Sequence, residues 1–359
     1  MTNAVSANKK KRVARKILGA LLAVTISTIL IGSAFFRPSF EEGFRLVARF
    51  PFEQWLKDLP KNIWWVGLFA LFSASMAPLR GWRWGFTLPK PKPPYSDRYH
   101  AVALGLLGNN VIPGKLGEGL RALAMTRFSR KRGREIPFPQ ALGTILVCKL
   151  LDLVALLILV AGSPNGPFFG TNVFGGGFVG AAIAIPALTV GLLAVGRWAP
   201  RLADALHRKK RAPRVQLLLR ELALGVAASG SPKRLGLALL ATLVAISSVA
   251  MGYTIALWGV GVDVDPLAGV ILLAAVTLGQ SPPGVPAGLG MYYLSSSWAA
   301  RLLGATGEQA ATIAVLTHLT TVLSHLGVGA ATVVIRRVRL RDFLPRKGEP
   351  PADRDPASA

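Results

Sequence analysis

Six apolar runs, each near the length of a bilayer crossing, constrain the fold of this chain more than any other feature. A helix needs about 20 apolar residues to cross the hydrocarbon core of a membrane. Of the 359 residues, 52% are hydrophobic and 16% are charged, which favours an all-α polytopic membrane protein over a soluble domain. The expected spans are Ile17–Phe36, Asn62–Leu79, Phe138–Ala161, Phe178–Ala199, Leu235–Val260 and Gln309–Ile335.

The positive charges lie between these runs. A net charge of +25 would indicate nucleic acid binding in a soluble protein, but here Lys and Arg are placed to set topology and to meet anionic headgroups. We therefore expect no nucleic-acid partner. We also expect an inner (cytoplasmic) membrane protein with both termini in the cytoplasm: a basic N-terminus at 1–16, a membrane domain at 17–335 and a basic tail at 336–359. The segments expected on the cytoplasmic side are Lys9–Lys16, Arg80–Arg98, Arg127–Arg134, Arg197–Arg234 and Arg336–Lys347.

Two further apolar segments, Tyr99–Thr126 and Pro266–Ala305, do not fit this alternation. The first has basic sequence on both sides, and the second lies between the acidic GVDVDP and GATGE. Each must enter and leave on one side of the membrane, and each is interrupted by Pro and Gly. The sequence therefore predicts two oppositely oriented re-entrant helical hairpins, an inverted repeat of the kind found in transporters. The residues expected to form their tips are Pro113, Gly114 and Gly117, and Pro286, Gly288 and Gly290.

Polar residues surround the first tip. Asn109 and Asn110 can satisfy backbone groups that the break leaves without partners. Lys115, Glu118 and Arg121 recur every three residues and would share one face of the second limb. Two interpretations stay open: a structural ion pair, or a site that accepts a phosphate headgroup through Lys115 or Arg121 while Glu118 orients the cation.

Other polar residues lie on the later apolar segments. Lys149 and Asp152 are three apart on one span, as a structural pair or as part of a site. Tyr293, in the second hairpin, is typical of packing or of an interfacial anchor. His318 and His325 are seven apart on the last span, which suits helix-to-helix hydrogen bonds or a proton relay.

Motifs of enzyme chemistry have little support. The single cysteine, Cys148, excludes an intramolecular disulfide, and no Cys/His spacing predicts a metal site. Neither a nucleophile elbow nor a phosphate-binding glycine loop stands out. We expect no metal and no cofactor.

Several stretches resemble the flippase-like membrane region of the lysylphosphatidylglycerol synthase family, as in the multiple peptide resistance factor. They are LRGWRW, GNNVIPGKLGEGLRAL, LLDLV and GVPAGLGMYYLSSSWAARLLGATGEQAATIAVLTH. The resemblance runs from about Ile17 to Ile335, and its most specific part is an NN-x-x-PG-x-x-GE-x-x-R pattern. That pattern places on family positions Asn109, Asn110, Pro113, Gly114, Gly117, Glu118 and Arg121, and Asp152 matches a family aspartate.

The chain departs from the family pattern at two places. Cys148-Lys149 stands where many members have Glu-Arg, and Tyr293 occupies a position that is acidic in many members. The chain looks more like the branch that lacks this acid and carries a histidine, here His318, on the last span. A mechanism that needs an acidic residue in the second hairpin therefore does not transfer to this chain.

The resemblance implies the movement of a phospholipid across the membrane, while a separate soluble domain, which we expect this chain to lack, modifies that lipid. We expect flippase- or scramblase-type translocation of an anionic phospholipid or another lipid-linked amphiphile. The alternatives are a membrane transferase that uses Glu118 or Asp152 as base, and a non-catalytic subunit that recruits a lipid-modifying enzyme. The expected partners are anionic lipids, and a separate modifying enzyme and a homo-oligomer stay open. The expected substrate-binding residues are Asn109, Asn110, Lys115, Glu118, Arg121, Lys149, Asp152, Tyr293 and His318.

Overall fold

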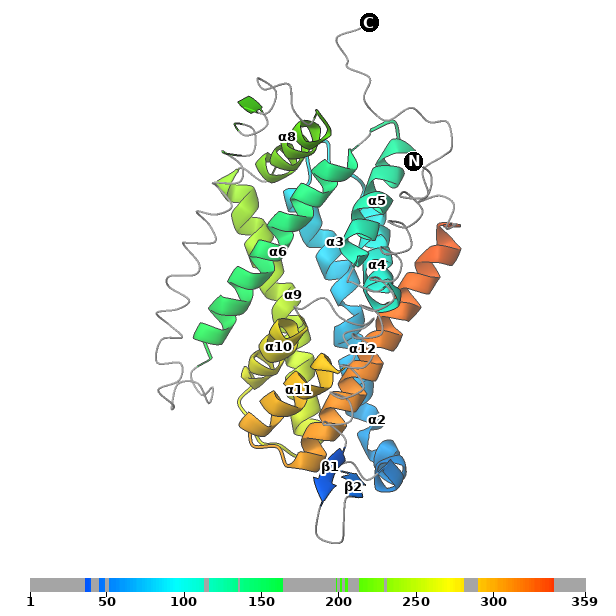
Figure 1. The fold of residues 1–359 in the computed structure, drawn as a ribbon, viewed down its shortest axis with the longest axis vertical. Helices are drawn as coiled ribbons and strands as arrows, with labels where there is room; N and C mark the ends of the chain where they lie inside the picture. The colour runs from blue at the N-terminus through cyan, green and yellow to red at the C-terminus, as the bar shows by residue number, and fades with distance from the viewer. Residues whose placement is uncertain are drawn as a thin grey trace, which may run out of the picture.

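The described part of the chain is a bundle of helices with one small β-hairpin at its lower end (Figure 1). Strands β1 (Phe36–Ser39) and β2 (Arg45–Ala48) pair antiparallel, and α2 begins at Phe52. The computed structural model describes residues 36–39, 45–48, 52–112, 116–134, 136–163, 198, 201, 204–205, 213–228, 231–280 and 290–338.

Four helical segments in these residues are long and apolar enough to cross a membrane. The first, Pro60–Thr87, comprises most of α2 (Phe52–Ala74) and all of α3 (Met76–Thr87), and the others are α6 (Phe138–Ala161), α9 (Pro232–Gly259) and α12 (Gly307–Ile335). They correspond to four of the six expected spans. The spans expected at 17–36 and 178–199 lie, apart from Phe36 and Trp198, outside the described residues.

Shorter helices form two helical hairpins. Helix α4 (Tyr95–Val111) packs against α5 (Gly117–Arg130), and α10 (Ala268–Gly279) packs against α11 (Met291–Leu302). In Figure 1 the first hairpin occupies the upper half of the bundle and the second the lower half. Their lengths of 17, 14, 12 and 12 residues correspond to about 18–26 Å, less than the roughly 30 Å hydrocarbon core.

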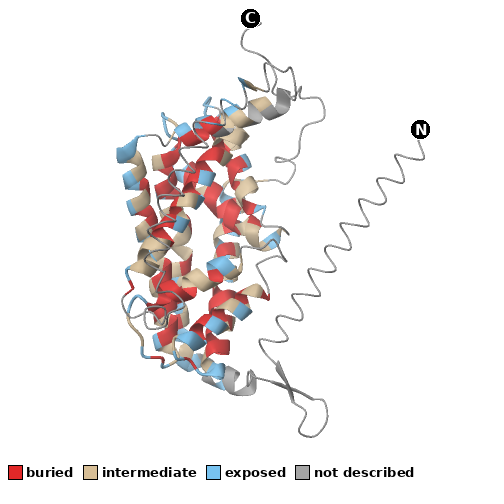
Figure 2. Ribbon diagram, turned by 60° about the vertical axis from the view of Figure 1, so that its left-hand side comes forward, coloured by how far each residue is buried: buried red, intermediate tan, exposed pale blue. Residues whose placement is uncertain are grey.

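Each hairpin has its own hydrophobic core. Helices α3, α4, α5 and α6 share the upper core, which lies around Trp84, Leu104 and Met125. Helices α2, α9, α10, α11 and α12 share the lower core, which lies around Trp65 and Leu272. Buried residues accordingly occur in both halves of the bundle in Figure 2. Helix α12 contacts both hairpins, since it packs against α4 and against α11.

The upper end of the bundle differs from the expectation of a basic loop at Arg80–Arg98. Helix α3 continues to Thr87 and carries Arg83 into the protein, where its side chain is buried. The indole N–H of Trp84 donates to Thr144 Oγ1 of α6 at 2.9 Å, so packing extends the helix beyond the apolar run. Helix α8 (Pro213–Ala227), within the segment Arg197–Arg234 expected on the cytoplasmic side, packs on α6 at the same end.

Candidate functional site

Two cross-helix ion pairs connect α3, α5 and α6 in the upper half of the bundle. The guanidinium of Arg83 on α3 pairs with the carboxylate of Asp152 on α6 and is only 1% exposed. On α5, Glu118 accepts from Lys149 Nζ of α6 at 2.7 Å and lies 3.5 Å from Arg121 Nη1. Ion pairs therefore join α6 to α3 and to α5.

The predicted pair of Lys149 with Asp152 is wrong, because each residue finds its partner on a different helix. Residues three apart on α6 are neighbours on its surface, yet Lys149 contacts α5 and Asp152 contacts α3. A buried guanidinium needs a carboxylate to offset its loss of hydration. Arg83 therefore fixes Asp152, while the pair of Glu118 with Arg121 expected from their spacing is formed.

Arg121 is held mainly by an aromatic ring. Its Cζ lies 4.0 Å from the centroid of the Trp84 ring, and its side chain is buried. The Nε and Nη2 atoms have no hydrogen-bond partner among the described residues. A desolvated cation–π contact of this kind contributes about 2 kcal/mol. Arg121 is thus a buried cation with hydrogen-bonding capacity left over.

The two asparagines of the first hairpin make structural bonds. Asn109 Oδ1 accepts the backbone N–H of Gly117 at 3.0 Å, which joins the end of α4 to the start of α5. Asn110 Nδ2 donates to Leu106 O at 2.8 Å and lies 3.2 Å from His325 Nδ1 on α12. The hairpin is therefore closed by one asparagine and tied to α12 by the other.

Glycines allow the limbs of the hairpins to approach. A Cβ atom at Gly117 would lie 2.5 Å from Asn109 Cγ, and one at Gly108 would lie 3.0 Å from the Cα of Gly117. In the second hairpin, Gly290 precedes α11 with φ of +88°, a conformation that glycine adopts without a Cβ penalty. The remaining residues expected at the tips are Pro113, Gly114, Pro286 and Gly288. Together with Lys115, they lie outside the described residues.

Tyr293 and His318 belong to a separate polar cluster in the lower half. The His318 ring stacks on Tyr292 with centroids 4.3 Å apart and meets Tyr293 edge-on at 5.0 Å. The hydroxyl of Tyr292 donates to Thr317 Oγ1 at 2.9 Å and lies 2.8 Å from the Tyr253 hydroxyl. These contacts join the second hairpin to α9 and α12. The structure places neither Tyr293 nor His318 in the ion-pair network around Glu118.

A groove of about 320 Å³ lies beside the ion pairs, between α3, α6, α9 and α10. Its polar end is formed by Arg80, Lys149 and Asp152. The remaining lining is apolar except for one threonine: Met76, Leu153, Leu156, Ala245, Ile246, Val249, Leu273, Thr277 and Leu278. Lys149 has a side chain 46% exposed and Leu278 is 59% exposed, so the groove reaches the surface of the described bundle. A molecule with a charged head and apolar chains fits this lining.

Arg80 and Arg83 are site residues that the sequence analysis did not single out. Within the described residues, no carboxylate lies within 4.0 Å of the Arg80 guanidinium. The signal that could have found both is the LRGWRW stretch, where two arginines three apart follow directly on an apolar run. Four cations and two carboxylates leave a surplus of two positive charges in this part of the described structure: Arg80, Arg83, Arg121 and Lys149 against Glu118 and Asp152.

A family model described as the lysylphosphatidylglycerol synthase TM region matches residues 17–329, well over half of the chain. No curated protein and no solved structure matches significantly. The family match confirms the resemblance inferred from the NN-x-x-PG-x-x-GE-x-x-R pattern.

Proposed function

Because the chain belongs to the family of lysylphosphatidylglycerol synthase transmembrane regions, we propose that it translocates an anionic phospholipid, or a similar lipid-linked amphiphile, across the cytoplasmic membrane. Membership of this family indicates a function on membrane lipids. The observation that carries the finer proposal is the groove, which has two cations and the Arg83-paired carboxylate of Asp152 at one end and a mostly apolar lining along the rest.

The headgroup of the lipid binds at the polar end of the groove. Arg80 and Lys149 supply donors for a phosphate, and charge-assisted bonds to phosphate are stronger than bonds between neutral groups. Glu118 pairs with Lys149 and Arg121, and Asp152 pairs with Arg83, but two carboxylates do not balance the four cations. The site therefore favours an anion over a zwitterion. The acyl chains lie along Leu153, Val249 and the rest of the apolar lining.

The two short helical pairs act as re-entrant hairpins that enter from opposite faces. Their helices are shorter than the hydrocarbon core, and by the positive-inside rule the basic loops at the upper end favour a cytoplasmic location for that end. The groove is lined by α3, which packs on the first hairpin, and by α10 of the second. In inverted-repeat transporters, binding near the midplane between such hairpins allows access from either leaflet.

A leaflet-resolved assay in proteoliposomes tests this function. The purified full chain should accelerate the exchange of fluorescent phosphatidylglycerol between leaflets, with less effect on phosphatidylcholine. Arg80→Gln combined with Lys149→Gln should lower the rate by about tenfold or more, because two charge-assisted bonds to the phosphate are lost. Arg301→Gln is the matched control, since it removes an exposed cation on α11 that does not line the groove.

Two results would contradict the proposal. One is a lack of acceleration by the native chain for every anionic lipid tried, and the other is full activity of the double variant. The mass of the lipid is measured in the same samples. A changed lipid mass would favour the membrane transferase instead, whereas an unchanged lipid that has moved between leaflets supports translocation.

A further inference from the structure

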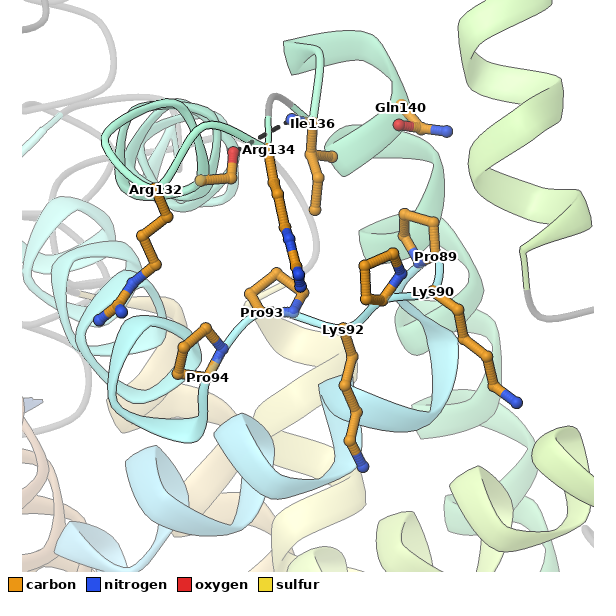
Figure 3. A pocket seen from close by; sticks show the side chains of 11 residues that line it. Pro89, Lys90, Lys92, Pro93, Pro94, Arg132, Arg134, Ile136 and Gln140 are labelled. Carbon is orange, nitrogen blue, oxygen red and sulfur yellow. Dashed lines mark hydrogen bonds between the residues drawn. The ribbon is translucent and has the colours of Figure 1, made fainter.

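A second pocket, of about 490 Å³, lies at the upper end of the bundle and shares no lining residue with the groove (Figure 3). One wall is the connection from α3 to α4, with the sequence PKPKPP at 89–94. The opposite wall is the connection from α5 to α6, including Arg132 and Arg134. The pocket therefore lies where four helices of the upper half begin or end.

Four cations line this pocket: Lys90, Lys92, Arg132 and Arg134. Arg132 Nε donates to Asp97 Oδ2 at 2.6 Å, so its charge is partly neutralised. For the other three, no ion pair is formed with any described carboxylate. Figure 3 shows the side chain of Arg134 extending toward the proline-rich wall. Beyond the pair of Arg132 with Asp97, the described lining of the pocket thus carries three cations without a described carboxylate as ion-pair partner.

The proline-rich wall is stiff. Four of its six residues are proline, whose ring fixes φ and reduces the number of conformations the loop can adopt. Lys90 and Lys92 alternate with these prolines and are exposed. Proline has no N–H, so hydrogen bonds to a ligand from this wall come from the lysine side chains and the two remaining backbone N–H groups.

Two helices begin at this pocket, and the N-terminus of α6 adds to its positive potential, while the first turn of α4 already carries the carboxylate of Asp97. Pro94, the N-cap of α4, lines the pocket, and so does Gln140 in the first turn of α6. The first-turn N–H groups of a helix have no intrahelical acceptor and carry partial positive charge. The start of a helix is a favourable place for a phosphate. Unpaired cations and helix ends therefore favour the same kind of ligand in this pocket.

We propose that this pocket binds a terminal phosphate carrying two negative charges, as in a phosphomonoester or a diphosphate. The inference does not depend on translocation through the groove. The same chemistry is offered by the headgroup of a phosphorylated lipid in the cytoplasmic leaflet and by a soluble phosphate compound.

Calorimetric titration of inorganic pyrophosphate into the full chain in detergent tests the soluble arm. The variant K90Q/K92Q/R134Q should bind at least about tenfold more weakly, because the loss of even one charge-assisted hydrogen bond weakens binding by about that factor. The matched control is K131Q/K233Q/R337Q, which removes three exposed cations that do not line the pocket. The control variant should keep the native affinity within about twofold.

Reconstitution in nanodiscs tests whether the pocket binds the headgroup of a phosphorylated lipid. Native protein and both triple variants are reconstituted with and without phosphatidic acid in phosphatidylcholine, and the lipid retained on the re-extracted protein is measured. Retention that is lost only in the pocket variant, without pyrophosphate binding, identifies a lipid headgroup. Pyrophosphate binding without selective retention of phosphatidic acid identifies a soluble ligand.

Three outcomes would overturn the inference: the native chain binds neither probe, both triple variants lose binding equally, or Arg80→Gln abolishes binding while the pocket variant does not. The first two outcomes would not contradict the proposed translocation through the groove. The third would mean that the anion binds in the groove and not in this pocket. Conversely, a chain that binds pyrophosphate in this pocket but moves no lipid would contradict only the proposed translocation.

Discussion

Arg83 and Asp152 form an ion pair across 69 residues of sequence, between helices α3 and α6. The arginine is buried beside the groove that Asp152 lines, so the pair fixes the relative position of the two helices. Arg80 lies one turn before Arg83, and Lys149 one turn before Asp152. The same pair therefore positions both cations at the polar end of the groove.

Replacing Asp152 by Asn leaves the Arg83 charge buried without a carboxylate. The loss of one partner of a buried pair costs about 3–5 kcal/mol, so the melting temperature in detergent should fall markedly. Asp204→Asn provides the control, because it breaks an exposed pair with Arg220 that contributes about 0–1 kcal/mol. Thermal unfolding followed by tryptophan fluorescence compares the two. An equal melting temperature for both variants would show that the Arg83–Asp152 pair is not needed for stability.

Gly117→Ala should weaken the first hairpin. The added Cβ would meet Asn109 and the backbone of Gly105, and such overpacking costs about 1–3 kcal/mol. Gly119→Ala, two residues further on the same helix, meets no atom within 4 Å and should be neutral or stabilising by up to about 1 kcal/mol. The melting temperature of Gly117→Ala should therefore fall, whereas that of Gly119→Ala should stay unchanged or rise. A fall for Gly119→Ala as large as for Gly117→Ala would contradict the close approach of the limbs.

The sequence could predict the elements that rest on local pattern. Four of the expected spans correspond to long apolar helices, and the flanking charges separated α4–α5 and α10–α11 from them. The ends of the helices were predicted less well. Arg80 looked like the start of a loop because the apolar run stops at Leu79, whereas helix α3 continues to Thr87. Packing of Trp84 on α6, which no local pattern contains, extends the helix.

The partners in the candidate site could not be read from spacing. Residues three apart on a helix can pair, and Glu118 with Arg121 does so, but Lys149 and Asp152 do not. The choice depends on which neighbouring helix presents a buried charge, here Arg83 on α3. For the same reason, the sequence grouped His318 with the headgroup site, whereas the fold brings it against Tyr292 in the lower half.

Two polar contacts join α4 to α12, and each should stabilise the fold independently of the other. Asn110 Nδ2 lies 3.2 Å from His325 Nδ1, and His100 Nδ1 lies 3.0 Å from Thr332 Oγ1. Double-mutant cycles on the free energy of unfolding should give about 0.5–1.5 kcal/mol of coupling within each pair, using alanine at Asn110 and the histidines and valine at Thr332. Asn110→Ala with Thr332→Val is the control and should be additive within about 0.5 kcal/mol. Additivity within the Asn110–His325 pair would mean that this contact does not hold the hairpin to α12.

Single cysteines at the ends of each short helical pair should reveal its topology. Cys148, the single native cysteine, is buried, so background labelling of the native chain is low. If each pair is a re-entrant hairpin, Ser96→Cys and Lys131→Cys should both react with an impermeant maleimide from the cytoplasmic side only. By the same reasoning, Leu267→Cys and Arg301→Cys should both react from outside only.

Right-side-out and inside-out vesicles give the two sides of this measurement. Detergent-solubilised protein is the control and should be labelled at all four positions, because each lies exposed in the structure. Labelling of Ser96→Cys and Lys131→Cys from opposite sides would mean that α4 and α5 together cross the membrane once. The groove would then lack a hairpin from the cytoplasmic face, and access from both leaflets would need another route.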